Sequence, residues 1–486
     1  MQAPALNPDV LDYIMAFSNK KALINTMLVS RDLHRGGIKH LLRDVPRLRN
    51  TDQIKCFLVF CDARGQVAET AYRMNYLRGL DLDLGSGYRD KMLQPTLGLT
   101  SQALTQFFTS TVRVYAHNFA RLTIFRCGDL FDGDLALPLT ISSLTTLTYL
   151  HLGDATKGSF SLLTSLQSRL VEVNIGMNID LYEPPGIDIT SLLRHSGSSM
   201  TIISLYYTSS PTGVACYPLV HTLDACRLHM PTTRHYVTTF PNLQVLNASQ
   251  CLGRHLEDEE KWTRRRNLNI SQQAQAGSWR SLRGYVGSIL FLYLLSLACH
   301  VTYVSVHDFD YEVMDFGQVW AVVADTQPEH LEIHASTVFS VLDQAADIIA
   351  LCSSPEFQSL KTFKLGLSLC PGDHNTDMEA MLECIFTAIS SSASLIGFAL
   401  DIESWFGGCG SGGDSTVLGG GLTGNTQGLE LSPGRAQVFL ESLDVDSVAD
   451  RLLGCCQSLR AVQVTLRGVT VERGPTNIFF DAESLR

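Results

Sequence analysis

The chain lacks the cysteine pattern of a metal-binding or disulfide-bonded protein. Its thirteen cysteines are scattered without a Cys-x-x-Cys pair, and only Cys455 and Cys456 are neighbours. Neither a structural zinc module nor a disulfide framework is therefore expected. The amino terminus also lacks the charged and then apolar pattern of a secretory signal, and Asp9 and Asp12 stand where a mitochondrial presequence avoids acids. We expect a reducing compartment, either the cytoplasm, the nucleus or both.

Charged residues are few, at 17% of the chain, while hydrophobic residues make up 45%, which excludes a disordered chain. The net charge of -11 is uneven, because residues 1 to 50 carry eight Lys or Arg against four Asp or Glu. An acidic body argues against nucleic-acid binding, which needs a clustered positive surface. The one basic cluster, 261–266, follows the acidic run 257–260. A solvated helix face with compensating charges is favoured there over a nuclear-import signal.

Motifs for catalysis are also missing. The sequence has no Gly-x-Ser-x-Gly elbow and no phosphate loop. Gly408, Gly410 and Gly413 have the spacing of a dinucleotide-binding turn, but no helical pattern follows to hold the phosphates. His330 and His334 are four residues apart, yet the residues between them alternate as in a strand. We expect no enzyme activity, no metal and no cofactor.

No apolar run is long enough for a clear membrane span. Residues 284–307 contain no Asp, Glu, Lys or Arg, but Ser288, Ser296, His300 and Thr302 interrupt the segment. A buried helix followed by a strand is the favoured interpretation, and a membrane-attached repeat receptor is the alternative.

One short pattern, apolar-x-x-apolar-x-apolar, returns along most of the chain. The clear copies begin at Leu77, Leu147, Leu170, Leu243, Val301, Leu360, Leu395 and Leu459, and weaker copies begin at Phe119, Met200, Val220, Leu282 and Pro328. The last two apolar positions of each copy are two residues apart, so they point to the same side of a short strand. Such strands must stack in parallel, with helices or loops covering their apolar side. An ordinary α/β chain with abundant leucine is the alternative.

This pattern resembles the leucine-rich-repeat family in its irregular, ribonuclease-inhibitor-like form, over roughly residues 75 to 470. The Asn or Cys that follows the strand in that family is matched in places, by Cys127, Asn178 and Cys251. The resemblance implies an α/β horseshoe solenoid over 51–486. A Gly-rich insertion at about 407–434 is expected to interrupt it, since ten glycines lie within 407–428.

The first fifty residues predict a small helical module. Asn7 can cap a helix that begins at Pro8, with apolar residues at helical spacing as far as Phe17. A second helix follows a polar break, and Gly36 and Gly37 are expected to punctuate the module. A unit this small rarely buries its apolar surface alone, so its exposed stripe predicts a partner.

This segment resembles the F-box. The opening of that motif is matched by Leu6, Pro8, Asp9, Val10 and Leu11, its middle by Ile14 and Met15, and its second half by Leu23, Ile24, Leu28, Val29, Ser30 and Arg31. Asn7 and Leu33 depart from it, standing where many members have proline and tryptophan. The resemblance implies docking to a Skp1-like adaptor, and through it to a cullin. The residues expected to contact the adaptor are Leu6, Pro8, Val10, Leu11, Ile14, Leu23, Leu28 and Val29.

The order of the two modules predicts the substrate-recognition subunit of an SCF-type ubiquitin ligase, without catalytic residues of its own. The target, an unidentified protein, is expected to bind the strand residues that alternate with the core positions. Those with most recognition character are Asp81, Tyr149, His151, Glu172, Tyr206, Tyr303, His307, His334 and Lys364. The alternative is a non-ligase repeat scaffold in which the N-terminal helices are only a cap.

Overall fold

A computed structural model describes most of the 486 residues. It covers 7–83, 94–132, 134–178, 187–228, 230–251, 259–307, 315–335, 342, 344–369, 373–404, 434–467 and 469–474. The chain divides into two compact units, one formed by 1–229 with 238–242 and the other by 230–237 with 243–486. The predicted Gly-rich insertion and its Gly408, Gly410 and Gly413 lie outside the described residues, apart from Gly434 at the end of that range.

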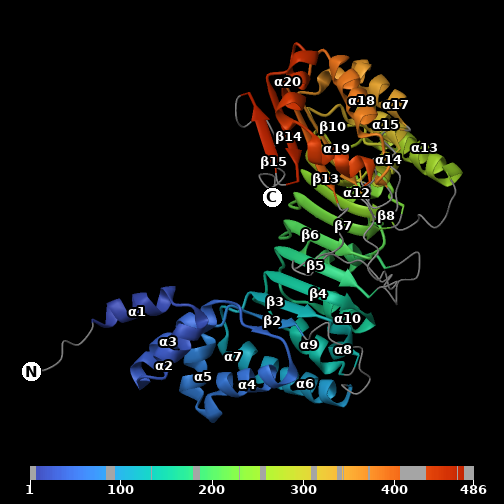
Figure 1. The fold of residues 1–486 in the computed structure, drawn as a ribbon. Coiled ribbons are helices and arrows are strands. Elements are labelled where there is room, and N and C mark those ends of the chain that lie inside the picture. Colours follow the sequence, from blue (N-terminus) through green and yellow to red (C-terminus); the bar gives the residue numbers. More distant parts are fainter. Residues whose placement is uncertain are drawn as a thin grey trace, which may run out of the picture. The chain divides into compact units, whose positions relative to one another are not determined.

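The first unit is a mixed α/β structure with parallel strands (Figure 1). Its strands are β1 (Arg47–Leu48), β2 (Gly79–Asp83), β3 (Arg121–Phe125), β4 (Tyr149–Ala155), β5 (Glu172–Met177), β6 (Ile202–Tyr206) and β7 (Thr222–Leu228), each paired in parallel with the next. Its helices are α1 (Pro8–Phe17), α2 (Lys20–Met27), α3 (Arg31–Arg43), α4 (Thr51–Asp62), α5 (Val67–Met74), α6 (Gln94–Phe107), α7 (Arg113–Tyr115), α8 (Cys127–Phe131), α9 (Ala136–Ser142), α10 (Lys157–Ser165) and α11 (Ile189–Leu192). Short turns of other helix types span Ala63–Gly65, Phe108–Val112 and Arg194–Ser196.

The second unit repeats this arrangement and ends differently. Its strands are β8 (Val245–Cys251), β9 (Ser281–Ser288), β10 (His300–His307), β11 (His330–Ala335), β12 (Thr362–Leu369), β13 (Gly397–Ser404), β14 (Ala461–Leu466) and β15 (Val469–Arg473). Pairing is parallel from β8 to β14, whereas β15 turns back to pair antiparallel with β14. The helices are α12 (Thr233–Thr239), α13 (Glu259–Ala276), α14 (Ile289–Leu295), α15 (Phe316–Thr326), α17 (Ala345–Ser353), α18 (Met378–Ser390), α19 (Arg435–Ser442) and α20 (Val445–Cys455), with a 3-10 turn at Pro355–Ser359.

The repeated apolar pattern forms the strands, as predicted. Each of its thirteen copies lies on one of the strands β2 to β14. In β2, Leu80 and Leu82 are completely buried, and they lie opposite Leu122 and Ile124 of β3. In both units helices cover the side of the strands to which these apolar residues point (Figure 1). We call the other side, formed by the alternate residues, the open face.

Two strands escaped the sequence pattern. β1 has two residues, too few to show alternation, and it continues the sheet only because it pairs with β2. β15 lies beyond the last copy of the pattern and runs in the opposite direction to its neighbour. Such elements are recognised by what they pair with, not by their own residues.

The apolar segment 284–307 forms a strand, a short helix and a second strand, so the prediction of a buried helix followed by a strand is confirmed. α14 has seven residues, and all but Tyr293 are buried. Throughout the described ranges, no helix combines the length and the hydropathy that crossing a bilayer requires.

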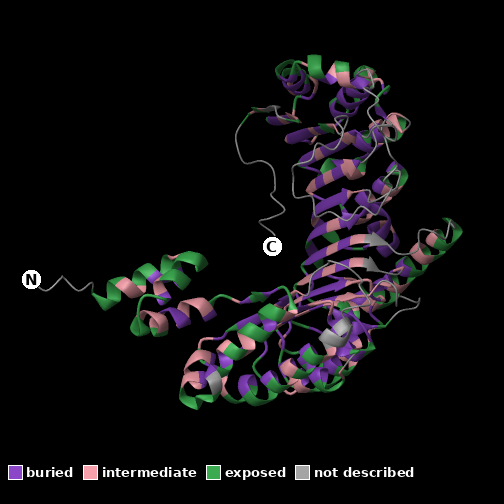
Figure 2. Cartoon of the chain, turned by 60° about the horizontal axis from the view of Figure 1, so that its bottom comes forward, coloured by how far each residue is buried: buried purple, intermediate pink, exposed green. Residues whose placement is uncertain are grey.

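The N-terminal helices begin as the sequence predicts. The Asn7 side chain accepts a hydrogen bond from the backbone N–H of Asp9 at 3.0 Å, and Pro8 is the first residue of α1. Asn19 caps α2 in the same way, and the Ser30 side chain accepts from Leu33 N at the start of α3. In Figure 2 these three helices carry long exposed stretches, whereas the strands are largely buried.

The prediction that Gly36 and Gly37 punctuate the module is wrong, because both lie inside α3. A Cβ atom at Gly37 would lie 2.3 Å from Met27 Cγ, and one at Gly36 would lie 3.2 Å from Met15 Cε. The glycines therefore allow α3 to pack closely against the other two helices.

The helix α13 is held mainly by polar side chains. Asn269 and Gln273 are almost completely buried, although this helix is otherwise polar and exposed. Asn269 accepts from Thr233 N at 3.1 Å and donates to Pro231 O at 3.1 Å and Leu294 O at 2.6 Å. The Asn269 side chain thereby joins three backbone groups of neighbouring segments to α13.

The basic cluster 261–266 forms the amino-terminal part of α13. Arg264 pairs with Glu260 one turn earlier, which agrees with the predicted compensation of charge on a solvated face. Arg266, in contrast, turns inward, where it lies 2.7 Å from Asp325 Oδ2 and donates to Tyr293 O. The cluster is thus partly structural.

Candidate interaction surfaces

The N-terminal helices pack their own interior and still leave apolar side chains in solvent. Met15, Leu23, Met27, Ile38 and Leu42 are each at most 5% exposed. Around them lie apolar residues that are between 42% and 77% exposed, and these are Val10, Tyr13, Ile14, Phe17, Ile24, Leu28 and Val29. Large apolar side chains exposed on a small folded module are typical of a surface that another protein covers. We call these seven residues the apolar patch.

The predicted adaptor contacts divide between this patch and the interior. Val10 (45% exposed), Ile14 (47%), Leu28 (77%) and Val29 (75%) belong to the patch. Leu23 is buried and holds the module together. Pro8 is exposed, Leu11 is half-buried, and Leu6 lies outside the described residues.

Sequence reasoning missed Tyr13 as part of this surface. The Tyr13 ring lies 4.6 Å from the ring of Phe17, and the two are 67% and 75% exposed. Their spacing of four residues on a helix was the signal that could have revealed the pair.

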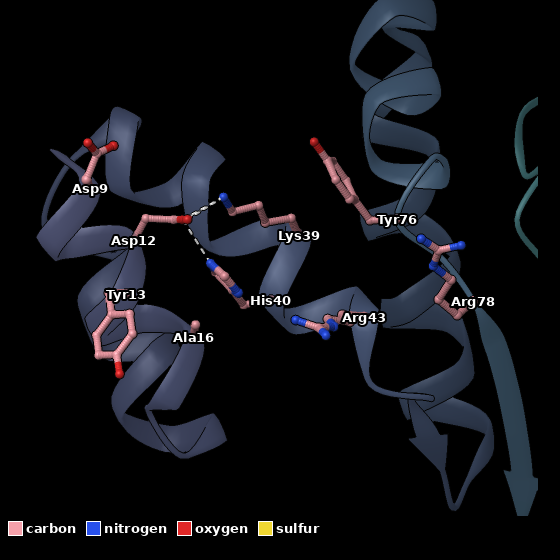
Figure 3. A pocket seen from close by; sticks show the side chains of 9 residues that line it. All are labelled: Asp9, Asp12, Tyr13, Ala16, Lys39, His40, Arg43, Tyr76 and Arg78. Atoms are coloured by element: carbon pink, nitrogen blue, oxygen red, sulfur yellow. Dashed lines mark hydrogen bonds and ion pairs between the residues drawn. The ribbon is translucent and has the colours of Figure 1, made fainter.

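A cleft of about 480 Å³ borders the apolar patch, between α1 and α3 on one side and the segment from α5 into β2 on the other (Figure 3). On the α1 side, Asp12 is already paired. Its Oδ1 lies 2.6 Å from Lys39 Nζ and 2.9 Å from His40 Nε2. Hydrogen bonds from Lys39 and then His40 lower the pKa of Asp12 below its ordinary value.

The opposite wall of the cleft carries Tyr76 and Arg78, and Arg43 of α3 lies between the two walls (Figure 3). Arg43 and Arg78 are both exposed. Among the described residues neither guanidinium makes a hydrogen bond or an ion pair. Asp9, at the mouth on α1, is likewise exposed and its carboxylate has no described partner.

On the open face of the first unit, the predicted target-binding residues fall into two rows. The parallel register places Tyr149 beside Glu172, and Asp81 in the same row as His151, with Thr123 between them. Tyr206 lies farther along the face, on β6. All five are half-buried by their neighbours.

Cationic and aromatic neighbours hold these side chains. Arg47 of β1 lies 2.7 Å from Asp83 and 3.9 Å from Asp81, so the outward acidic pair is bound by an arginine. The Arg121 guanidinium lies 3.8 Å from the centre of the Tyr149 ring. Burial raises the pKa of Asp81 above its ordinary value, in opposition to the nearby Arg47 charge.

His151 is the most strongly perturbed group of this face. Its ring lies 4.7 Å from the ring of Phe125. Burial, and to a smaller extent the Arg121 charge, lowers the pKa of His151 to about 4. This histidine is therefore neutral at physiological pH and presents a polar, uncharged surface.

On the open face of the second unit, three residues converge on Glu332 of β11. Tyr303 donates its hydroxyl to Glu332, His334 Nε2 lies 2.8 Å from Glu332 Oε1, and Lys364 Nζ lies 2.7 Å from the same oxygen. Lys364 also reaches Asp401 Oδ2 at 3.1 Å. Burial alone would raise the pKa of Glu332, but the hydrogen bonds from His334, Lys364 and Tyr303 hold it far below its usual range.

The register explains why these residues meet. Glu332 lies opposite Lys364, His334 lies opposite His307, and Tyr303 lies diagonally across from Glu332. The prediction included Tyr303, His307, His334 and Lys364 but not Glu332 at their centre. Tyr303, expected to face solvent, is only 2% exposed, because its neighbours cover it. Burial lowers the pKa of His307 to about 4.

His330 and His334 lie on the strand β11 and not on a helix, as predicted. His330 Nδ1 lies 2.8 Å from Thr362 Oγ1, while His334 is directed to Glu332. Within the part of the chain that the structure describes, no three His, Cys, Asp or Glu side chains gather as a metal site would require.

No known protein-family model matches the chain, and no curated protein matches it.

Proposed function

We propose that this chain is the substrate-recognition subunit of an SCF-type ubiquitin ligase, resembling F-box proteins with leucine-rich repeats. The helices α1 to α3 bind a Skp1-like adaptor, and through it a cullin, while the open face of the strands binds a protein target. The chain makes no covalent bond itself. It brings the target close to the ligase, which raises the effective concentration of the reacting groups. The proposal keeps the cytoplasmic or nuclear location expected from the sequence.

The apolar patch is the observation that carries this proposal. Leu28 and Val29, at the end of α2, are 77% and 75% exposed although the interior beneath them is packed. Burying one such side chain against a partner contributes about 1.5 to 3 kcal/mol. A helical module that only closed the end of a repeat array would have no reason to display these side chains.

Charge supports the same interpretation. The first fifty residues carry an excess of four positive charges on a chain whose net charge is -11. Skp1 is acidic in the family that the module resembles, so the basic module would be steered toward it.

The open face supplies chemistry suited to protein recognition. Tyr149, His151 and Glu172 form one group, and Tyr303, His334 and Lys364 with Glu332 form another. Aromatic and charged side chains held in place by their neighbours bind with little loss of side-chain entropy.

The test is retention of the full chain on purified, immobilised Skp1. The variant Leu28→Asp with Val29→Asp places two charges in the patch, so we expect retention to fall by at least about thirtyfold, equivalent to about 2 kcal/mol. The matched control is Val59→Asp with Val67→Asp, since these residues of α4 and α5 are 63% and 64% exposed in the same unit. The control should be retained like the wild type.

A non-ligase scaffold with a helical cap is the second candidate, and one contact favours it. Tyr72 of α5 donates its hydroxyl to Arg35 O of α3 at 3.0 Å, and the Arg35 guanidinium lies 4.8 Å from the centre of the Tyr72 ring. The module is thus fixed to the next helix, as a cap would be. If the wild-type chain is not retained by Skp1 at all, the scaffold is the better description.

A further inference from the structure

We propose that the cleft between α1, α3 and the Tyr76–Arg78 segment binds an acidic stretch of a partner protein, whose carboxylates are held by Arg43 and Arg78. The inference rests on the proposed function in one respect, namely that this partner also covers the apolar patch. It adds a second contact of different chemistry beside that patch.

The charges in the cleft leave these two arginines available. Lys39 is committed to Asp12, at 2.6 Å, so this pair contributes no net charge. Arg43 and Arg78 remain exposed, and within the described ranges their guanidinium groups have no partner. Asp9 is the one remaining described carboxylate of the lining, so the unpaired charges sum to an excess of one positive charge.

Guanidinium groups are suited to a carboxylate ligand. Each presents N–H donors in a rigid fork that matches the two oxygens of an Asp or Glu side chain. Tyr76 lines the same cleft and adds a hydroxyl group to it (Figure 3). The volume of about 480 Å³ accommodates several side chains, more than a single inorganic ion needs.

The cleft and the apolar patch are continuous through Tyr13. This residue lines the cleft, and its ring contacts Phe17 at 4.6 Å on the patch. A polypeptide lying over α1 would therefore meet apolar side chains first and the arginines next. An anionic membrane has the same two chemistries, but a flat bilayer surface does not enter a cleft, which is why we favour a protein.

The experiment measures binding of a fluorescein-labelled octaglutamate peptide to the full chain by fluorescence anisotropy, at low and physiological salt. The test variant is Arg43→Gln with Arg78→Gln. The matched control is Arg113→Gln with Arg169→Gln. These two arginines are exposed in the same unit, and their replacement removes the same charge. We expect the dissociation constant to rise at least about tenfold in the test variant and to change less than about twofold in the control.

A second variant tests the cleft in the opposite direction. Asp9→Asn removes the carboxylate at the mouth, so octaglutamate should bind about threefold more tightly, whereas Asp32→Asn, at an exposed site on α3, should have little effect. Gain of binding cannot result from misfolding. If both arginine doubles weaken binding equally, the peptide responds only to net charge and the proposal is overturned. The proposal is also overturned if the wild type does not bind octaglutamate. It is likewise overturned if binding of phosphatidylserine vesicles depends on Arg43 and Arg78 but binding of the peptide does not.

The two proposals fail separately. If octaglutamate binding depends on Arg43 and Arg78 but Skp1 does not retain the chain, the cleft proposal stands and the ligase proposal is wrong. If Skp1 retains the chain but octaglutamate does not bind in this way, the ligase proposal stands and the cleft proposal is wrong.

Discussion

Replacing Asn269 should weaken the second unit far more than its place on a polar helix suggests. The side chain is fully buried and makes hydrogen bonds to three backbone groups, Thr233 N, Pro231 O and Leu294 O. Asn269→Ala leaves all three without a partner. Each unsatisfied buried group costs about 1 to 3 kcal/mol, so even at the lower end the free energy of unfolding should fall by about 3 kcal/mol.

The assay is urea denaturation followed by circular dichroism, combined with hydrogen exchange of residues 230 to 307. Asn267→Ala is the control, because Asn267 is exposed on the same helix and the change brings the same gain in helix propensity. Exchange at the Thr233 amide should accelerate only in Asn269→Ala. Equal stability of the two variants would refute the reasoning, since it would mean that water or relaxation replaces the buried bonds at no cost.

Two further predictions concern the first unit. His151 has its ordinary pKa of 6.5 in the unfolded chain, whereas burial lowers the pKa to about 4 in the folded protein. The free energy of unfolding should therefore fall by about 3 kcal/mol as the pH drops from 6.5 to 4. In thermal denaturation at several pH values, His151→Gln should reduce that loss. Gly37→Val would force a side chain against Met27, so the free energy of unfolding of the module should fall by about 1 to 3 kcal/mol. Backbone amides of residues 20 to 43 should then exchange hydrogen faster, and Gly36→Ala should have a smaller effect on both measurements. The first expectation is contradicted if His151→Gln leaves the pH dependence of thermal stability unchanged. The second is contradicted if residues 20 to 43 of Gly37→Val exchange as slowly as in the wild type.

Sequence reasoning found the strands because their signal is local. Leu80 and Leu82, or Val304 and Val306, are two residues apart and fully buried, and the same spacing recurs thirteen times. The caps at Asn7 and Pro8 are equally local. Features that depend on a distant neighbour were missed, as the two glycines of α3 show, since a glycine inside a helix looks like a helix end until Met27 is seen beside it.

The open face shows the same division. Alternation correctly placed Tyr303, His334 and Lys364 on one side of their strands, but it gave no reason to choose Glu332, which all three contact. The cleft was not predicted at all. Arg43 and Arg78 are 35 positions apart in the sequence, and only the packing of α3 against α5 brings them to one cavity.

Under the proposed ligase function, the direct joining of α3 to the first sheet strands would set how far a target is held from the ligase. Only Asp44 to Pro46 separate the end of α3 from β1, and Pro46 O accepts a hydrogen bond from Asp81 N at 3.0 Å. Adjacent strands of a sheet are about 4.8 Å apart, so each step from β1 toward β7 lengthens the reach by one such increment. In a subunit built this way, the strand that grips the target would set which of its lysines come within range of ubiquitin.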